Sequence, residues 1–297
     1  MNKSLITLSY ILATRNKLPY LRVALAELIK NKKSDEEIII IDGASTDGSV
    51  EFLQTLFSEG KIQQFISEPD NGEAHADNKA IMMAKGTLIK IITDDDAFHY
   101  PSIARCKEFM LAHLEIDILS TDGVKRRKNI KYPYSSMLYQ SRFEVRQRRG
   151  TPFASCGLGL MLRKSSLPIV GLLHTHFARV DAEYTLRVTA GNAKMAWFTL
   201  ESYAHIRNSG SNSVKQERRM TEELERLEIL YLGTTPYLSL KQKIRAVAHQ
   251  YKERLLGSHT QHPIESEAFE NEWGELFSSS LLWLERNAKE NSGEFLF

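Results

Sequence analysis

Residues 37–48 read Glu-Ile-Ile-Ile-Ile-Asp-Gly-Ala-Ser-Thr-Asp-Gly, and residues 88–96 read Leu-Ile-Lys-Ile-Ile-Thr-Asp-Asp-Asp. In both stretches a short, strand-like apolar run is followed directly by carboxylates. In an open α/β sheet, ligands gather beyond the carboxyl ends of the strands. We therefore expect Asp42 and the run from Asp94 to Asp96 to face one crevice, with a nucleotide diphosphate and a divalent metal as the predicted occupants.

Outward from these two stretches, short apolar runs alternate with amphipathic segments through the first 120 residues. This alternation is typical of a mostly parallel sheet flanked by helices. Pro19 can open the first helix and Gly86 can end the third. Ser45, Thr46 or Asp47 can cap the second. Strands are expected at residues 6–13, 38–41, 62–66, 88–92 and 116–120, and helices at 20–31, 49–57, 73–84 and 101–113.

The regular alternation stops after Asp122. Residues 125–150 are rich in Arg, Lys and Tyr without a clean period, and we expect hairpins or mobile loops there. Further on, the pattern predicts strands at 157–162 and 194–198 and a helix at 180–190. Apolar residues at three- and four-residue spacing predict helices at 220–232 and 240–256, with one or two more between 262 and 297.

Composition excludes few classes of protein. The 297 residues are 42% hydrophobic and 26% charged with a formal net charge of +2, so nothing requires a nucleic-acid partner. Cys106 and Cys156 lie far apart and outside any metal-ligand spacing, which favours reduced thiols in a cytosolic protein. No signal peptide or membrane-length apolar run is present, so we expect a cytoplasmic protein, at most peripheral at the inner face of the membrane.

The three consecutive aspartates have two interpretations. Carboxylate oxygens suit Mg²⁺ or Mn²⁺, and such an ion could bridge two phosphates and stabilise the charge on a diphosphate leaving group. The alternative is a solvated turn after a strand, where aspartates are common. Three aspartates in a row at a strand end favour the ligand interpretation.

Asp42 also has two interpretations. It could accept the imide N–H of a pyrimidine base or a ribose hydroxyl, or the loop that follows could simply cap a helix through Ser45 or Thr46. The loop lacks both the GxGxxG spacing and the lysine of a P-loop, so neither of those phosphate-binding motifs is supported.

The stretches that matter together are residues 9–16 (Ser-Tyr-Ile-Leu-Ala-Thr-Arg-Asn), 40–49 (Ile-Ile-Asp-Gly-Ala-Ser-Thr-Asp-Gly-Ser), 68–72 (Glu-Pro-Asp-Asn-Gly), 78–79 (Asn-Lys), Gly86 and 93–96 (Thr-Asp-Asp-Asp). Together they resemble family 2 glycosyltransferases of the GT-A fold. The resemblance covers roughly the first 120 residues in the family's order and spacing, which is more specific than any single motif.

The resemblance implies roles on the donor side. The residues that match nucleotide-binding positions of the family are Thr14, Arg15, Asn16, Asp42, Lys79 and Asp94. Asp42 matches the residue that holds the base, usually uracil. Asp94 and Asp95 match the DxD-type motif that contacts ribose and metal, and Asp95 is the expected ligand of Mn²⁺ or Mg²⁺.

On the acceptor side, the resemblance places the catalytic base at Asp181, in the segment Val-Asp-Ala-Glu-Tyr-Thr-Leu-Arg of residues 180–187. A base there would take the acceptor hydroxyl proton while the sugar is attacked opposite the leaving diphosphate, which inverts the anomeric carbon. The alternative is an acidic first helical turn favoured by the helix dipole. His205, with Arg207 and Asn208 ahead of a loop at 209–213, could contact metal or phosphate, or be a structural histidine.

Three positions depart from the family's pattern. Thr93 stands where the family often has Asp or Asn. Gly43 stands where the family often has a second Asp. His75 stands where an Asp is frequent, which leaves the acceptor side open.

Two basic clusters, 125–128 and 146–149, could bind an anionic acceptor or acidic headgroups, or could be solvated surface. The basic helix expected at 240–256 could lie on a membrane, but an amphipathic helix packed on the domain is the default interpretation.

We therefore predict a GT-A-like α/β catalytic domain over 1–213, with a nucleotide-binding half (1–122) and an acceptor half (123–213), followed by a helical C-terminal extension (214–297). The predicted activity is an inverting, metal-dependent transfer of a sugar, with UDP the expected donor nucleotide, to a glycan or lipid-linked acceptor. The C-terminal helices would be the natural site of a homodimer contact. Two alternatives are a non-catalytic nucleotide-sugar-binding or scaffold protein and, less favoured, a nucleotidyltransferase, for which residues 13–17 lack a glycine-rich loop.

Overall fold

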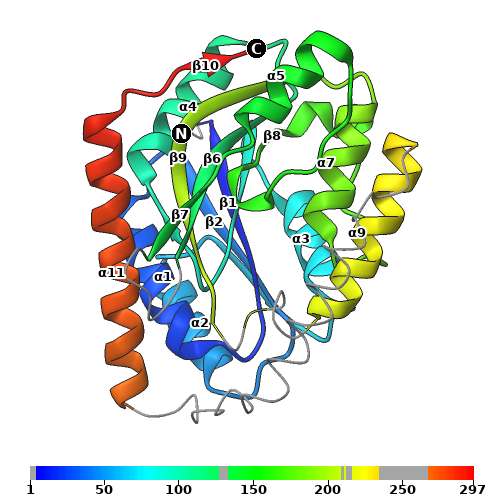
Figure 1. The fold of residues 1–297 in the computed structure, drawn as a ribbon. Coiled ribbons are helices and arrows are strands. Elements are labelled where there is room, and N and C mark those ends of the chain that lie inside the picture. Colours follow the sequence, from blue (N-terminus) through cyan, green and yellow to red (C-terminus); the bar gives the residue numbers. More distant parts are fainter. Residues whose placement is uncertain (1–4, 127–132, 209–210, 212–215, 234–266) are drawn as a thin grey trace, which may run out of the picture.

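The computed structural model describes residues 5–126, 133–208, 211, 216–233 and 267–297, and within them one mixed sheet has helices on both faces (Figure 1). The strand order is β10-β9-β6-β8-β4-β1-β2-β3, with β5 paired to β9 and β7 to β6. The strands are β1 (Leu8–Thr14), β2 (Glu36–Asp42), β3 (Gln64–Ser67), β4 (Leu88–Ile92), β5 (Ala97–Phe98), β6 (Ile118–Arg126), β7 (Tyr134–Met137), β8 (Met161–Arg163), β9 (Met195–Ile206) and β10 (Phe295–Leu296).

The first-half strands form a continuous parallel block, β3-β2-β1-β4, as the alternating pattern predicts. Further along the sheet, β6 also pairs in parallel with β9. Antiparallel pairing begins where β8 lies beside β4. In the register, Thr14 lies opposite Asp42, and Asp42 lies opposite Ser67. The carboxyl ends of β1, β2 and β3 therefore meet at one edge of the sheet.

Helices cover both faces of the sheet because each face is apolar. One core cluster packs the sheet against α1 (Leu18–Asn31), α2 (Ser49–Ser58) and α4 (Tyr100–Ala112). A second packs the opposite face against α3 (Glu73–Met83), α5 (Gln140–Arg149) and α7 (Val180–Ala190). At the two flanks, α11 (Glu267–Glu290) packs on α1 and β9, and α9 (Glu217–Leu232) packs on α7.

The predicted helices and strands of the first 120 residues are present, with boundaries shifted by a few residues. Pro19 lies in the first turn of α1, and Asp47 accepts hydrogen bonds from the first backbone amides of both α1 and α2, those of Leu18 (2.9 Å) and Ser49 (3.1 Å). Gly86 was expected to end α3, but the helix ends at Met83. A side chain at Gly86 would collide with the backbone of β1, with a Cβ only 2.6 Å from the Ser9 nitrogen.

The second half differs more from expectation. Residues 125–150 do form the β6–β7 hairpin, but also helix α5, which buries only Phe143 and so has no apolar period to detect. The strand expected at 194–198 continues to Ile206, while the one expected at 157–162 is only β8, preceded by the 3₁₀ turn η1 (Gly157–Gly159).

The C-terminal tail forms α11 and then adds β10 to the edge of the sheet beside β9. The helix expected at 240–256 lies outside the described residues. The division of the chain at 213/214 remains a prediction. Among the described helices, none combines the length and apolarity that a bilayer crossing requires.

One charge lies inside the sheet. Lys90, in the middle of β4, is 1% exposed and donates hydrogen bonds to the carbonyl oxygens of Leu158 and Leu160, the latter at 3.1 Å. Burial lowers the pKa of Lys90 to about 7 from its usual 10.5. The lysine therefore ties η1 to β4 at the cost of an unfavourable buried charge below neutral pH.

The stability of the fold should therefore depend on pH through Lys90. Between pH 7 and 10 the unfolded chain keeps a proton on this lysine that the folded protein has released, so the free energy of unfolding rises with pH in that window. The stability of wild type relative to Lys90→Met should increase by about 2–3 kcal/mol from pH 6 to pH 9, at about 1.4 kcal/mol per pH unit. Urea unfolding at the two pH values measures this change. The exposed-lysine control Lys30→Met should show no such change, and parallel curves for wild type and Lys90→Met would contradict the assignment.

Candidate functional site

The end of β1 contacts the aspartates that follow β4. The hydroxyl of Thr14, the last residue of β1, donates to Asp94 Oδ2 at 2.7 Å. Thr14 and all three aspartates are buried. Two of the sequence-predicted residues, Thr14 and Asp94, are thus in direct contact although they are 80 positions apart in the chain.

Asp42 is also buried at this edge, but its carboxylate is engaged by its own surroundings. Oδ2 accepts hydrogen bonds from the Ser45 amide (2.9 Å) and the Ser67 hydroxyl (2.7 Å), and Oδ1 accepts one from the Ser45 hydroxyl. Asn16 then links the loop after β1 to the loop after β2. Its backbone N–H donates to Ser45 Oγ (2.8 Å), and its side-chain Oδ1 accepts from the backbone N–H of Thr46 (2.8 Å). Asp42 therefore organises the loop whatever else it binds.

Lys17, which the sequence analysis did not single out, provides the cation between the acidic side chains. Its Nζ lies 3.1 Å from Asp94 Oδ1 and 2.7 Å from Asp95 Oδ2. Burial raises the pKa of Asp94 to about 6 despite the opposing effect of Lys17, and Asp95 adds to the rise. Burial also opposes ionisation of Asp95, but Lys17 and a hydrogen bond from Asn208 hold its pKa below the usual value. Lys17 thus favours a negatively charged Asp95.

The third aspartate, Asp96, turns away from this pair. Oδ1 accepts from His205 Nδ1 (3.0 Å) and the Ile206 amide (2.8 Å), while Oδ2 accepts from the Thr93 hydroxyl (2.8 Å). Burial alone would lower the pKa of His205, but the Asp96 carboxylate raises it above its usual value. His205 is therefore held by Asp96 through one ring nitrogen, and its proposed contact with metal or phosphate remains a prediction.

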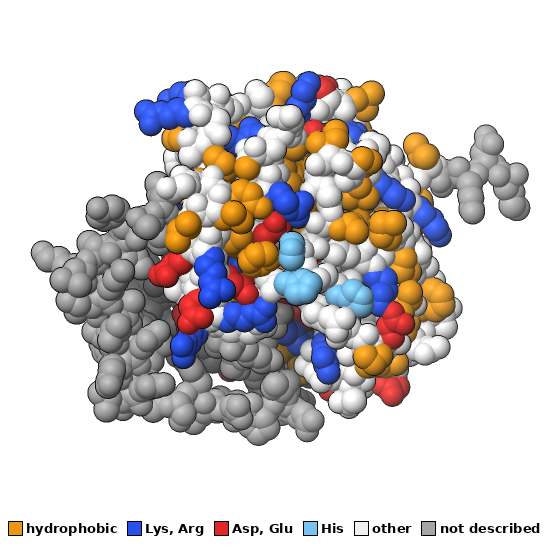
Figure 2. Space-filling view, turned by 90° about the vertical axis from the view of Figure 1, so that its right-hand side faces the viewer, with side chains coloured by type: hydrophobic (Ala, Val, Ile, Leu, Met, Phe, Trp, Pro, Cys, Tyr) orange, Lys and Arg blue, Asp and Glu red, His pale blue; other side chains and the backbone are white. Residues whose placement is uncertain are grey.

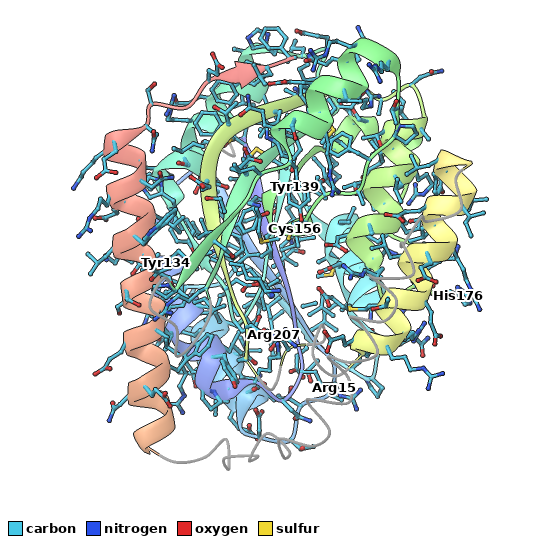
Figure 3. All side chains as sticks on the ribbon, in the orientation of Figure 1. Arg15, Tyr134, Tyr139, Cys156, His176 and Arg207 are labelled. Atoms are coloured by element: carbon cyan, nitrogen blue, oxygen red, sulfur yellow. The ribbon has the colours of Figure 1, made fainter. Side chains whose placement is uncertain are left out.

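The segment after β9 closes on the same aspartates. Asn208 Nδ2 donates to Asp95 Oδ2 at 2.9 Å, and the Ser211 hydroxyl donates to the same oxygen at 3.3 Å. Figure 3 shows Arg207, after β9, and Arg15, after β1, near the same ends of the strands. Of the loop expected at 209–213, only Ser211 lies within the described residues.

The remaining residues predicted to bind the nucleotide lie around this edge of the sheet. Lys79, on α3, forms an ion pair with Glu68. Arg15 lies against Gly43, where a Cβ would come within 2.6 Å of Asp70 Oδ2 and 3.1 Å of Arg15 Cδ. A larger residue at position 43 would therefore clash with Asp70 and Arg15, which explains why this chain has glycine where the pattern often has an aspartate. His75, the other departure near this edge, accepts a hydrogen bond from the Asn71 amide at 3.2 Å.

Asp181 lies in the first turn of α7. Its carboxylate accepts from the Ala182 amide (2.8 Å) and weakly from the Gly157 amide (3.4 Å). Burial raises the pKa of the Cys156 thiol to about 12, and both Asp181 and Asp96 add to this rise. The thiol of Cys156 lies with Tyr139 near the centre of the molecule in Figure 3.

The neighbouring acidic residue of α7 has a structural role. Glu183 is buried and accepts two hydrogen bonds from Arg187, at 2.8 and 3.2 Å. Near Asp181, Arg142 lies over the ring of Tyr139, 5.6 Å from its centroid. Of the two acidic groups at the start of α7, only Asp181 is free of a salt bridge among the described residues.

The basic clusters do not form one uniform surface. Arg146 donates to the carbonyl oxygens of Thr189 (3.0 Å) and Ala193 (3.4 Å), so it fastens α5 to the fold, whereas Arg148 pairs with Glu144. Residues 127 and 128 of the other cluster lie outside the described residues. On the face shown in Figure 2, basic and acidic side chains are intermixed and histidines gather near the middle.

A divalent cation is compatible with the Asp94–Asp95 pair. Both side chains offer hard oxygen ligands, and they already hold a cation, the ammonium of Lys17. No group of three or more His, Cys, Asp or Glu side chains in the described part of the chain is arranged as a metal cage. An ion at this pair would need further ligands from outside the protein side chains, as Mg²⁺ commonly takes from phosphates and water.

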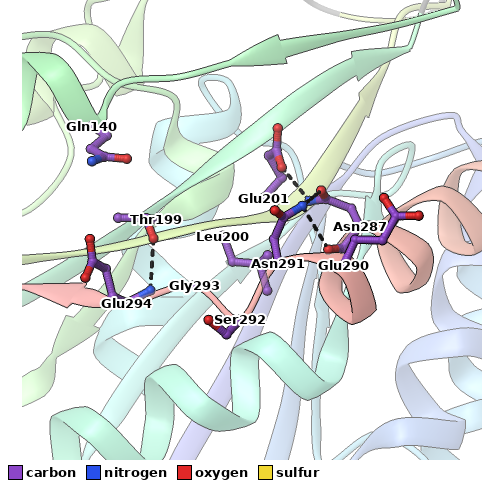
Figure 4. A pocket seen from close by; sticks show the side chains of 10 residues that line it. All are labelled: Gln140, Thr199, Leu200, Glu201, Asn287, Glu290, Asn291, Ser292, Gly293 and Glu294. Atoms are coloured by element: carbon purple, nitrogen blue, oxygen red, sulfur yellow. Dashed lines mark hydrogen bonds between the residues drawn. The ribbon is translucent and has the colours of Figure 1, made fainter.

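A separate polar pocket of about 590 Å³ opens between β9 and the C-terminal tail (Figure 4). It contains none of the residues that the sequence predicts for the site. Its lining is Gln140, Thr199, Leu200, Glu201, Asn287, Glu290, Asn291, Ser292, Gly293 and Glu294.

Comparison with known proteins identifies the relatives of this chain. The family model described as "Glycosyl transferase family 2" matches residues 9–167, more than half of the chain. A "PGL/p-HBAD biosynthesis glycosyltransferase" of Mycobacterium bovis (strain BCG / Pasteur 1173P2) is 26% identical over 127 residues, 42% of this chain and 49% of the relative. The match therefore spans about half the length of that curated relative.

Solved structures share the fold. S. aureus TarS 1-349 in complex with UDP has a TM-score of 0.53 at 16% identity, covering 86% of this chain and 73% of that one. The mannosyltransferase PcManGT from Pyrobaculum calidifontis, in complex with GDP-Man and Mn²⁺, has a TM-score of 0.57 at 17% identity, covering 93% and 87%. At these identities the likeness establishes a GT-A-type fold and no more, in agreement with the predicted fold class.

The hydrogen bonds of Asp96 predict a mainly structural role for this residue. Asp96→Ala should lower the free energy of unfolding by about 2–4 kcal/mol, because it leaves several buried donors without a partner. Chemical denaturation measures the change. The exposed carboxylate Glu59 provides the control, since Glu59→Ala should alter stability by less than about 0.5 kcal/mol. An equally small effect at Asp96 would contradict the structural role.

Proposed function

Because the chain belongs to glycosyl transferase family 2, we propose that it transfers a sugar from a nucleotide-diphosphate donor to an acceptor hydroxyl with inversion of the anomeric carbon. The observation that carries this proposal is the convergence of three segments on Asp95: Lys17 after β1, the aspartate run after β4, and Asn208 after β9.

On the donor side, the base and ribose would lie against the loops after β1 and β2. Asn16 and Asp42 fix those loops relative to each other, which favours a preformed binding surface. Arg15, Lys79 and Lys17 supply positive charge around it. Thr14 orients Asp94, so that this carboxylate can accept from a ribose hydroxyl without moving.

Asp94 and Asp95 are the residues that would hold Mn²⁺ or Mg²⁺. When bound, such an ion would stabilise the negative charge of the departing diphosphate. Asn208 and Ser211 already fix Oδ2 of Asp95, so the carboxylate is oriented before any ligand arrives. His205 is proposed as an additional contact to metal or phosphate.

On the acceptor side, Asp181 is proposed as the general base. Two backbone amides hold its carboxylate, which favours one orientation of the accepting oxygen. Removing the hydroxyl proton while the sugar carbon is attacked opposite the diphosphate gives a single displacement, and inversion follows. Arg142 lies over the ring of Tyr139, and we include both residues as proposed contacts of the acceptor.

We further propose UDP as the donor nucleotide and a glycan or lipid-linked sugar as the acceptor. The support is a relative named for PGL/p-HBAD biosynthesis and a structural neighbour solved with UDP, although another neighbour was solved with GDP-Man. A cytoplasmic location, with peripheral membrane contact, and a homodimer also belong to this proposal.

Two substitutions separate catalysis from donor binding. Asp181→Asn should keep nucleotide affinity but lower transfer by at least about 10²-fold, since general base catalysis typically contributes 10²–10⁴-fold. Asp95→Ala should weaken Mn²⁺-dependent nucleotide binding as well. Transfer assays and calorimetry on the same preparations measure both effects, with the exposed Glu222→Gln as control. Transfer by Asp181→Asn at the wild-type rate would overturn the base assignment.

The donor class can be tested without knowing the acceptor. Calorimetric titration of UDP, GDP, dTDP and CDP, each with Mn²⁺ and with chelator, should give tight, Mn²⁺-dependent binding of UDP alone. A preference for another nucleotide would correct the donor and keep the transferase. No binding of any nucleotide would count against the transferase and favour a scaffold function.

A further inference from the structure

Lys17 is the one described basic side chain that contacts the Asp94–Asp95 pair. It precedes α1 directly, and its side chain is 13% exposed, against 6% and 9% for the two carboxylates. A buried carboxylate without a partner is costly, so an internal cation at this place stabilises the ligand-free protein. The same position between the two carboxylates is the one that a divalent ion would take.

The two carboxylates are also oriented by groups other than Lys17. Thr14 holds Asp94 Oδ2, while Asn208 and Ser211 hold Asp95 Oδ2. These donors come from the ends of β1 and β9, and none of them carries a charge. Removing the ammonium would therefore leave an oriented pair of acidic side chains, and replacing it by another cation would need no rearrangement of the strands.

We propose that Lys17 is a built-in competitor of the divalent ion, which binds to Asp94 and Asp95 only when the ammonium leaves them for the diphosphate of the donor. This rests on the proposed function, which supplies the diphosphate. A divalent ion would sit about 2.1 Å from a carboxylate oxygen. Lys17 lies 2.7 Å from one of those oxygens, so the two cations would repel each other strongly at these distances.

A lysine suits such an exchange better than an arginine. Its ammonium is a compact point charge on a four-carbon stem, which can turn from carboxylates to a nearby phosphate. The consequence is thermodynamic coupling: the diphosphate frees the carboxylates for the metal, and by reciprocity the metal increases affinity for the diphosphate. The ion would then bind weakly to the free protein and tightly with nucleotide present.

Electron paramagnetic resonance of free Mn²⁺ tests this without measuring transfer. The full chain is titrated as wild type, as Lys17→Met and as the control Lys30→Met, an exposed lysine of α1, each with and without UDP. Without nucleotide, Lys17→Met should bind Mn²⁺ at least tenfold more tightly than wild type or Lys30→Met. UDP should tighten Mn²⁺ binding strongly in wild type and much less in Lys17→Met.

Unchanged or weaker Mn²⁺ binding in Lys17→Met would overturn the proposal, as would an equal effect of UDP on both proteins. If Lys17→Met is unfolded, Lys17→Gln takes its place, and Mn²⁺ should raise its Tm more than that of wild type. The outcomes are separable from the proposed function. If the wild-type protein transfers sugar but Lys17→Met binds Mn²⁺ no more tightly than wild type, only the role of Lys17 is refuted. If Lys17→Met binds Mn²⁺ more tightly but the wild-type protein transfers no sugar, only the transferase is refuted.

Discussion

The parallel register of β2, β1 and β4 is the constraint on which the rest of the site depends. It brings Thr14 opposite Asp42 and carries the segment after Ile92 to the same edge of the sheet. Once the strand ends coincide, the loops that follow must share a small volume and satisfy one another's polar groups. Asn16 bonds to Ser45 and Thr46, and Asp47 accepts from the first amide of α1, so the loops after β1 and β2 form one unit.

That same constraint concentrates negative charge. Asp42, Asp94, Asp95 and Asp96 are all buried at one edge, where isolated carboxylates would be strongly unfavourable. The chain compensates them in two ways. Asp42 and Asp96 each accept three hydrogen bonds from hydroxyl, imidazole or backbone donors. Asp94 and Asp95 instead share the ammonium of Lys17, which is carried on a four-carbon stem. Only the second arrangement can exchange its cation without dismantling the loop, which is why ligand exchange is expected there and not at the neighbouring aspartate.

The sequence predicts the first half of the molecule well because its signals are local. Apolar runs, Pro19 and the acidic strand ends each report on their own neighbourhood, and the predicted helices and strands follow. The second half is harder because α5 buries a single residue, Phe143, and β9 alternates little. Within the site, the positions of the aspartates could be predicted, but not their different environments. Those depend on contacts across 77 to 116 positions, such as Lys17 with Asp94 and Ser211 with Asp95, which no local pattern encodes.

The two sides of the site are therefore fixed by different means. The aspartates after β4 are set by parallel strands whose loops bond to each other. Asp181 instead lies in the first turn of α7 and accepts from the Gly157 amide of η1, just ahead of β8, which runs antiparallel to β4. Lys90 joins the two, since it stands in β4 and holds the carbonyl oxygens of Leu158 and Leu160 on either side of Gly159. A buried lysine in a parallel strand is poor for stability but fixes the segment that contacts Asp181. The distance between the aspartates after β4 and the proposed base is then set by backbone hydrogen bonds and one buried amine.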